Sequence, residues 1–252
     1  MSRPSVLFLG GNGHAAVRLE PARRALAERG DPFELRDCPY PLGPSFDGML
    51  DELERTIDAW EAERPERLVH ATGIGALVAL ALRARGALQD TDVVLQGGVL
   101  WGLEQRWFPK IMRVGPMPHV LAAALRLPVM RRRFVKKQFE HEPSADFQRA
   151  FFDGYDDGDA FATWFGWLTS DLLRRLEREL PAQTGSLARL EAWWGTRDHV
   201  VSLEELRITE RALDATIPVR EFDAWGHYPM IDDPEGWVEE LARALAPAVD
   251  VH

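Results

Sequence analysis

Short apolar runs alternate along this chain with longer segments of helical periodicity, and glycine-rich or proline-rich turns separate the two. The runs predict strands over 5–9, 33–36, 68–71, 93–95, 187–194 and 219–224. The longer segments predict helices over 17–28, 46–63, 76–85 and 235–245. Strands that alternate with helices in this way are typical of an α/β fold, in which helices flank a mostly parallel sheet.

The pattern changes between residues 101 and 185, where helical periodicity interrupted by prolines replaces the alternation. We therefore predict a core domain made of 1–100 and 186–252, with a helical cap inserted over 101–185. The chain has 252 residues, of which 46% are hydrophobic, and this is enough for one large domain with a cap. Cap aromatics such as Trp101 and Trp107 are expected to line a lipophilic substrate pocket or to form the core of the cap.

Basic side chains concentrate in the first half of this insertion. Between Trp101 and Glu140 the chain has nine lysines and arginines against two acids, whereas its overall formal charge is −10. One interpretation is attraction of an anionic substrate or an anionic membrane surface. The interpretation that we favour is a solvated helix face.

Charge and cysteine content limit the possible functions. The acidic balance argues against nucleic-acid binding, and no apolar run reaches the length of a membrane span. The single Cys38 excludes an internal disulfide, and the first strand follows Met1 without a leader-like segment, so we expect a cytoplasmic protein. The histidines lack ligand spacing, which predicts no metal. The sequence does not indicate the oligomeric state.

A glycine-rich turn, Gly10-Gly11-Asn12-Gly13, separates the first predicted strand from the first predicted helix. With Ala16 it fits the G-x-G-x-x-G/A pattern of dinucleotide-binding folds, and Glu34 and Asp37 lie at about the distance expected of a ribose-binding acid. Oxidoreduction with a dinucleotide is thus a minor alternative.

Three further segments carry a different pattern. The segment Val69–Leu77 has small residues around Gly73 at a predicted strand-to-helix turn, in the form small-x-Gly-x-small. Shifting the frame to Thr72 places His70 and Ile74 where only small residues fit. Later, Asp198 follows Gly195 in a Gly-x-x-Asp-x-x-Val turn, and His227 follows Gly226 before the last predicted helix.

In this order, the three segments resemble the nucleophile elbow, the acid turn and the histidine loop of the α/β-hydrolase superfamily. The resemblance implies that Asp198 is the acid, that His227 is the base and that Gly73 occupies the position of the nucleophile. It also implies that the backbone N–H groups of Ile74 and Asn12 form the oxyanion hole. Without a side-chain nucleophile, an acyl-enzyme cannot form.

The resemblance also indicates which residues contact a substrate. Gly11 and Thr72 flank the expected site, and His14 departs from the usual pattern, in which glycine is common, so its side chain is expected to reach into the site. The pattern implies no cofactor.

Two functions remain open after this comparison. The first is an enzyme that hydrolyses an ester, a thioester or a lactone with a water molecule activated by His227, which Asp198 orients. The second is a catalytically inactive relative that binds an apolar small molecule under the cap. In that case the Asp198–His227 pair ties two loops together, and Gly73 is either natural or an engineered replacement of a serine.

Overall fold

The computed structural model describes residues 3–11, 15–64, 66–98, 100–155, 157–182, 187 and 189–246. Its centre is a parallel sheet of six strands in the order β2-β1-β3-β4-β5-β6. The strands are β1 (Ser5–Leu9), β2 (Glu34–Asp37), β3 (Arg67–Thr72), β4 (Asp92–Gln96), β5 (Leu190–Gly195) and β6 (Val219–Phe222). This order differs from the 3-2-1-4-5-6 order typical of dinucleotide-binding domains, so it does not favour the dinucleotide alternative.

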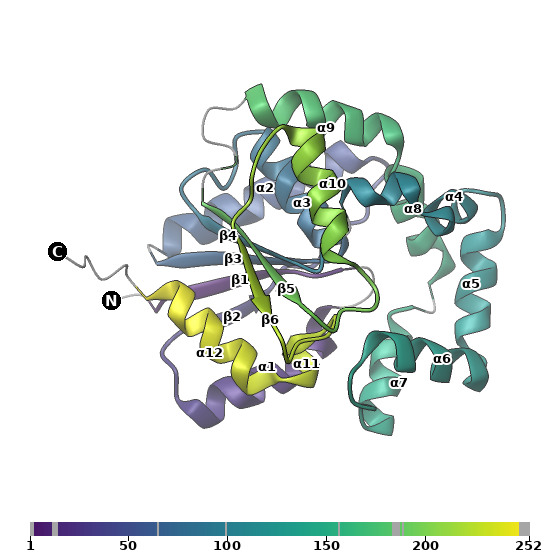
Figure 1. Ribbon diagram of the computed structural model, residues 1–252, viewed down its shortest axis with the longest axis horizontal. Helices are drawn as coiled ribbons and strands as arrows, with labels where there is room; N and C mark the ends of the chain where they lie inside the picture. Colours follow the sequence, from purple (N-terminus) through teal and green to yellow (C-terminus); the bar gives the residue numbers. More distant parts are fainter. Residues whose placement is uncertain are drawn as a thin grey trace.

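Helices cover both faces of the sheet (Figure 1). On one face lie α1 (Ala15–Arg29), α11 (Pro229–Asp232) and α12 (Pro234–Leu245), which pack against one another. On the other face lie α2 (Phe46–Glu63), α3 (Ile74–Ala84), α9 (Ser170–Ala182) and α10 (Leu203–Leu213). Every residue of β1 is buried, as expected for a strand between two helical layers.

A helical insertion lies between β4 and β5 and confirms the predicted fold class, an α/β sheet with an inserted cap. Besides α9, it contains η1 (Trp101–Gln105), α4 (Trp107–Met112), α5 (Met117–Leu125), α6 (Pro128–Gln138), α7 (Ala145–Asp153) and α8 (Gly158–Trp167). In Figure 1, α4 to α8 lie beside the sheet, whereas α9 packs against α3. The cap boundaries, 101–185, stay a prediction.

The structure corrects several boundaries. Helix α3 begins at Ile74 and not at Ala76, because Gly73 adopts a positive φ of 56° that lets the strand turn directly into the helix. Two helices, α10 and α11, were not predicted. Strand β5 begins at Leu190, three residues later than expected.

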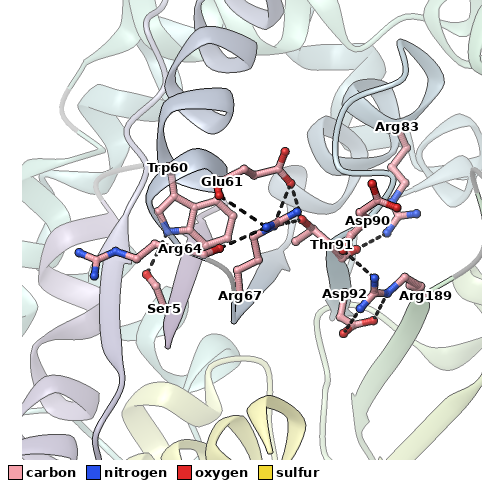
Figure 2. Close-up of polar contacts among 10 residues, drawn as sticks. All are labelled: Ser5, Trp60, Glu61, Arg64, Arg67, Arg83, Asp90, Thr91, Asp92 and Arg189. Carbon is pink, nitrogen blue, oxygen red and sulfur yellow. Dashed lines mark hydrogen bonds and ion pairs between the residues drawn. The ribbon is translucent and has the colours of Figure 1, made fainter. Parts of the chain in front are cut away.

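Polar side chains join the strands at their amino ends (Figure 2). Arg67 donates to the hydroxyl of Thr91 at 2.8 Å, and Arg189 donates to both carboxylate oxygens of Asp92 at 2.8 and 3.0 Å. The buried Arg83 donates to the Thr91 carbonyl at 2.6 Å. These contacts connect β3, β4 and β5 at the end opposite to the loops described next.

Register places three glycines at the carboxyl edge. Leu9 of β1 pairs with Ala71 of β3, and Thr72 of β3 pairs with Gln96 of β4. The chain therefore leaves the sheet at the same edge in the turns that contain Gly11, Gly73 and Gly97. In open α/β sheets, ligands bind beyond this edge.

Candidate active site

At the carboxyl edge of the sheet, the turn from β3 to α3 has a residue without a side chain, Gly73. Gly73 has φ 56° and ψ −123°, a conformation that is strained for a residue with a side chain. An ideal β-carbon on Gly73 would lie 3.3 Å from Cα of Gly11, whereas one on Gly75 would lie 2.2 Å from the Leu9 carbonyl oxygen. Gly75 thus allows α3 to cross close to β1. The first N–H groups of α3, including that of Ile74, have no acceptor within the helix.

His227 and Asp198 come from different loops and form a hydrogen-bonded pair. Nδ1 of His227 lies 2.9 Å from Oδ2 of Asp198, and their side chains are only 7% and 2% exposed. The other oxygen, Oδ1, accepts the backbone N–H groups of Val200 and Val201, each at 2.8 Å. The carboxylate is therefore held from two sides.

Burial alone would raise the pKa of Asp198, but the neighbouring His227 and the hydrogen bonds from Val200 and Val201 outweigh it and lower the pKa. Asp198 is therefore ionised. An ionised carboxylate only accepts hydrogen bonds, so Nδ1 of His227 is the donor in this pair, and the neutral imidazole has its lone pair on Nε2. The pair is arranged as a base.

Gly97 is a site residue that sequence analysis missed. It has a positive φ of 50°, and an ideal β-carbon there would lie 3.0 Å from Oδ2 of Asp198 and 3.2 Å from Nδ1 of His227. Only glycine leaves room for the pair at the end of β4. The available signal was the pair Gly97-Gly98, one residue beyond the strand predicted over 93–95.

A cavity of about 640 Å³ lies between the sheet edge and the cap. Its walls are mainly apolar and aromatic, with a few polar groups, as in many small-molecule sites. Its lining includes Gly11, Thr72, Gly73, Ile74, Val200, His227 and Tyr228 from the core, and Leu103, Trp107, Phe108, Leu121, Leu125, Phe134, Tyr155, Phe161, Phe165 and Leu168 from the insertion.

Most of the predicted substrate residues lie in this lining. Gly11, Thr72, Gly73 and Ile74 share the cavity with His227, and Trp107 lines it with a side chain that is 70% exposed. The hydroxyl of Thr72 is buried and has no hydrogen-bond partner among the described residues. Asn12 and His14 lie outside the described residues.

Trp101 does not lie in this lining. It is 3% exposed, and its indole N–H donates to Glu177 of α9 at 2.6 Å. Its position corresponds to packing between η1 and α9.

Two of the basic cap residues also line the cavity. Arg106 donates to Glu205 and to the Val200 carbonyl, the latter at 2.8 Å. Lys137 is exposed, as are Lys110, Arg113, Arg132, Arg133 and Lys136. The solvated helix face expected from the sequence thus describes most of these residues.

Two absences hold for the part of the chain that the structure describes. The described residues contain no group of three or more histidine, cysteine, aspartate or glutamate side chains placed to hold a metal ion. Within the same ranges, no helix is both long and apolar enough to cross a membrane.

Comparison with known proteins shows the fold. No family model and no curated protein matches the sequence. Among solved structures, a carboxylesterase from the thaumarchaeon Nitrososphaera gargenis has a TM-score of 0.65 at 12% identity, covering 96% of this chain and 90% of its own. The 2-hydroxy-6-oxo-6-phenylhexa-2,4-dienoate hydrolase from Rhodococcus sp. strain RHA1 has a TM-score of 0.61 at 16% identity, covering 96% and 90%.

A peroxisomal α/β-hydrolase from Saccharomyces cerevisiae has a TM-score of 0.61 at 11% identity, covering all of this chain and 80% of its own. The chain therefore has the α/β-hydrolase fold, with its helical insertion between β4 and β5. At these identities the likeness does not extend to the chemistry.

Proposed function

We propose that this protein with an α/β-hydrolase fold hydrolyses an ester, a thioester or a lactone without a covalent nucleophile. In the proposal, His227 activates a water molecule, and Asp198 orients His227. The observation that carries the proposal is the His227–Asp198 pair at 2.9 Å, facing a largely apolar cavity that also contains the bare backbone of Gly73.

The proposed reaction begins at Nε2 of His227. Because Nδ1 is engaged with Asp198, Nε2 is available to remove a proton from water while the water oxygen attacks the carbonyl carbon. The negative charge that develops on the carbonyl oxygen is stabilised by the N–H of Ile74 at the start of α3. His227 then returns the proton to the leaving group.

Gly73 occupies the proposed position of the nucleophile. The missing hydroxymethyl group leaves room beside the turn, and a water molecule needs about 30 Å³ and two or more polar partners. His227 and the N–H groups of the turn are such partners. A residual activity of about 10³–10⁴-fold over water persists in serine hydrolases that lack a triad member, so the proposal requires no unusual chemistry.

The size and apolar lining of the cavity support a second candidate function. A cavity of about 640 Å³ is large enough for an apolar small molecule, whether or not it reacts. In this alternative the protein binds its ligand and catalyses nothing, and the Asp198–His227 hydrogen bond joins two loops.

Hydrolysis assays on matched variants distinguish the two candidates. We would test p-nitrophenyl esters of increasing chain length, a phenyl thioester and a γ-lactone with the native protein, His227→Ala and Gly73→Ser. His141→Ala is the control, because His141 is exposed and outside the cavity lining. General-base catalysis predicts a loss of kcat of about 10²–10⁴-fold in His227→Ala and no change in His141→Ala.

Two other outcomes would also distinguish the two candidate functions. A native protein with no activity, together with a burst of product from Gly73→Ser, would contradict water activation by His227 and favour the binding protein. Equal activity in the native protein and His227→Ala would exclude His227 as the base.

A further inference from the structure

One arginine is buried beside the proposed site, on α1. Arg18 is 1% exposed, and its Nη2 donates to the hydroxyl of Tyr155 at 2.7 Å. Its guanidinium carbon also lies 5.2 Å from the ring centroid of Phe151, 5.8 Å from that of Tyr155 and 5.3 Å from that of Tyr228. The chain has only three tyrosines, and two of them contact this group.

The guanidinium lies directly behind the end of the cavity that contains Gly73. An ideal β-carbon on Gly11 would lie 3.2 Å from Nη1 of Arg18 and 3.8 Å from Cα of Gly73. Gly11, Tyr155 and Tyr228 line the cavity, and Arg18 itself does not. A positive charge is thus separated from the ligand space by one layer of atoms.

Arg18 keeps its charge. Burial disfavours the charged form, but Tyr155, Tyr228, Tyr40 and Asp37 outweigh it and raise the pKa of Arg18. Asp37, at the end of β2, is the only carboxylate among these influences.

The hydroxyl groups of Tyr155 and Tyr228 connect the guanidinium of Arg18 to the cavity through hydrogen bonds. Tyr155 accepts from Arg18, so its own proton must go to another acceptor, and it forms a hydrogen bond with Tyr228. Burial raises the pKa of Tyr155 well above its usual value, against the opposing charge of Arg18, so it remains a donor. The two hydroxyl groups have two protons in all, and the hydrogen bond between them uses one. The other proton is available to a third group. Among the described residues, no acceptor is recorded for it.

We infer that Tyr228, supported by Tyr155 and Arg18, donates a hydrogen bond to a carboxylate at this end of the cavity. The ligand class is therefore an apolar acid, with its body among the cap aromatics and its carboxylate beside Gly11 and Gly73. Such an acid is also the product that ester hydrolysis in this cavity would release, so the inference rests on the ligand cavity of the proposed function. A charged donor chain in an apolar site favours an anionic partner.

Lys137 and Arg106 provide a competing source of positive charge at the same cavity. Arg106 is already paired with Glu205, whereas Lys137 is exposed to solvent, where its charge is screened. The test must therefore separate the tyrosine pair from Lys137.

Calorimetric titration with octanoate and with octanamide provides that test, because the two ligands have the same chain and differ in head-group charge. At pH 8 we expect octanoate to bind the native protein at least about tenfold more tightly than octanamide. Tyr228→Phe and Tyr155→Phe should each reduce this preference about tenfold and leave octanamide binding within about twofold. Arg18→Met should abolish the preference.

Arg24→Met removes one exposed arginine from the same helix and should preserve the preference. Equal affinity for the two ligands, no binding of octanoate, or a preference that Lys137→Met abolishes while both tyrosine variants retain it, would overturn the inference. Where Arg18→Met does not fold, the two Tyr→Phe variants decide. Binding is measured without an ester, so failure of hydrolysis is a separate result.

Discussion

At the scale of single residues, the glycines at the sheet edge have different tasks. Gly73 provides a backbone conformation and leaves room for a small side chain, whereas Gly75 lets α3 pass against the backbone of β1. Gly97 leaves room for the His227–Asp198 pair. Glycine is required at each position for a different physical reason, and alanine substitutions distinguish these reasons.

We predict a large difference between Gly73→Ala and Gly75→Ala. Gly73→Ala should lower the free energy of unfolding by about 1–3 kcal/mol, because a residue with a side chain is strained at a φ of 56°. Gly75→Ala should lower it by about 4 kcal/mol or more, because its β-carbon would overlap the Leu9 carbonyl at 2.2 Å. Urea unfolding measures both. Equal costs would mean that the helix does not cross the strand as closely as described.

His70 shows a buried polar residue without a role at the site. It is fully buried in β3, its ring stacks on Phe8, and Nε2 accepts from Trp237 at 3.3 Å. Burial, opposed in part by the hydrogen bond with Gln96, lowers the pKa of His70 to about 3. It is therefore neutral in the folded protein, as expected of a core histidine.

At the scale of elements, the loop after β5 depends on one carboxylate. Asp198 accepts two backbone N–H groups through Oδ1 and holds His227 through Oδ2. The loop that leads into α10 and the loop before α11 are thus fixed together by a single side chain.

We predict that Asp198→Ala is less stable than Asp198→Asn by about 1.5–3 kcal/mol, because the asparagine oxygen still accepts from Val200 and Val201. Both variants should lose activity on any ester that the native protein hydrolyses. Urea unfolding at pH 7 compares the two variants, with Asp223→Asn as the control on an exposed carboxylate. Equal stability of the alanine and asparagine variants would show that the loop does not need the acceptor.

The pH dependence of the same comparison has a defined sign. The pKa of Asp198 is lower in the folded protein than in the unfolded chain, so its charge stabilises the fold above the unfolded value of about 4. This contribution is lost as the pH falls through the folded pKa. The stability difference between the native protein and Asp198→Asn should therefore decrease as the pH falls below about 4.

At the scale of the whole molecule, the sheet determines stability and the cap determines the shape of the cavity. Strands β1, β3, β4 and β5 are almost entirely buried, whereas α4, α5 and α6 carry most of the exposed large hydrophobic side chains, among them Trp107, Val120 and Val129. A change at the exposed wall of the cavity should therefore affect ligand binding and not global folding.

We predict that Trp107→Ala changes the free energy of unfolding by less than about 0.5 kcal/mol, because the side chain is 70% exposed. It should weaken binding of octanoate and octanamide alike, by about three- to tenfold, since it removes apolar contact area from the cavity wall. Calorimetry and urea unfolding on the same samples measure both effects. Val129→Ala, exposed and outside the cavity lining, is the control.

The sequence by itself indicated the strands, because strand and helix periodicities are local, and β1, β3, β4 and β5 contain apolar runs. It also indicated Gly73, Asp198 and His227, since small residues at a tight turn and an acid or a base in a loop leave a short-range pattern. Their proposed roles await the assays above.

Only the tertiary structure brought together groups that are distant in the chain and have no common pattern. Gly97 adjoins the His227–Asp198 pair through strand register, and Arg18 meets Tyr155 across 137 positions. The same applies to Trp101, whose indole contacts Glu177 and not the cavity. Contacts of this kind depend on how elements pack, which residue spacing does not encode.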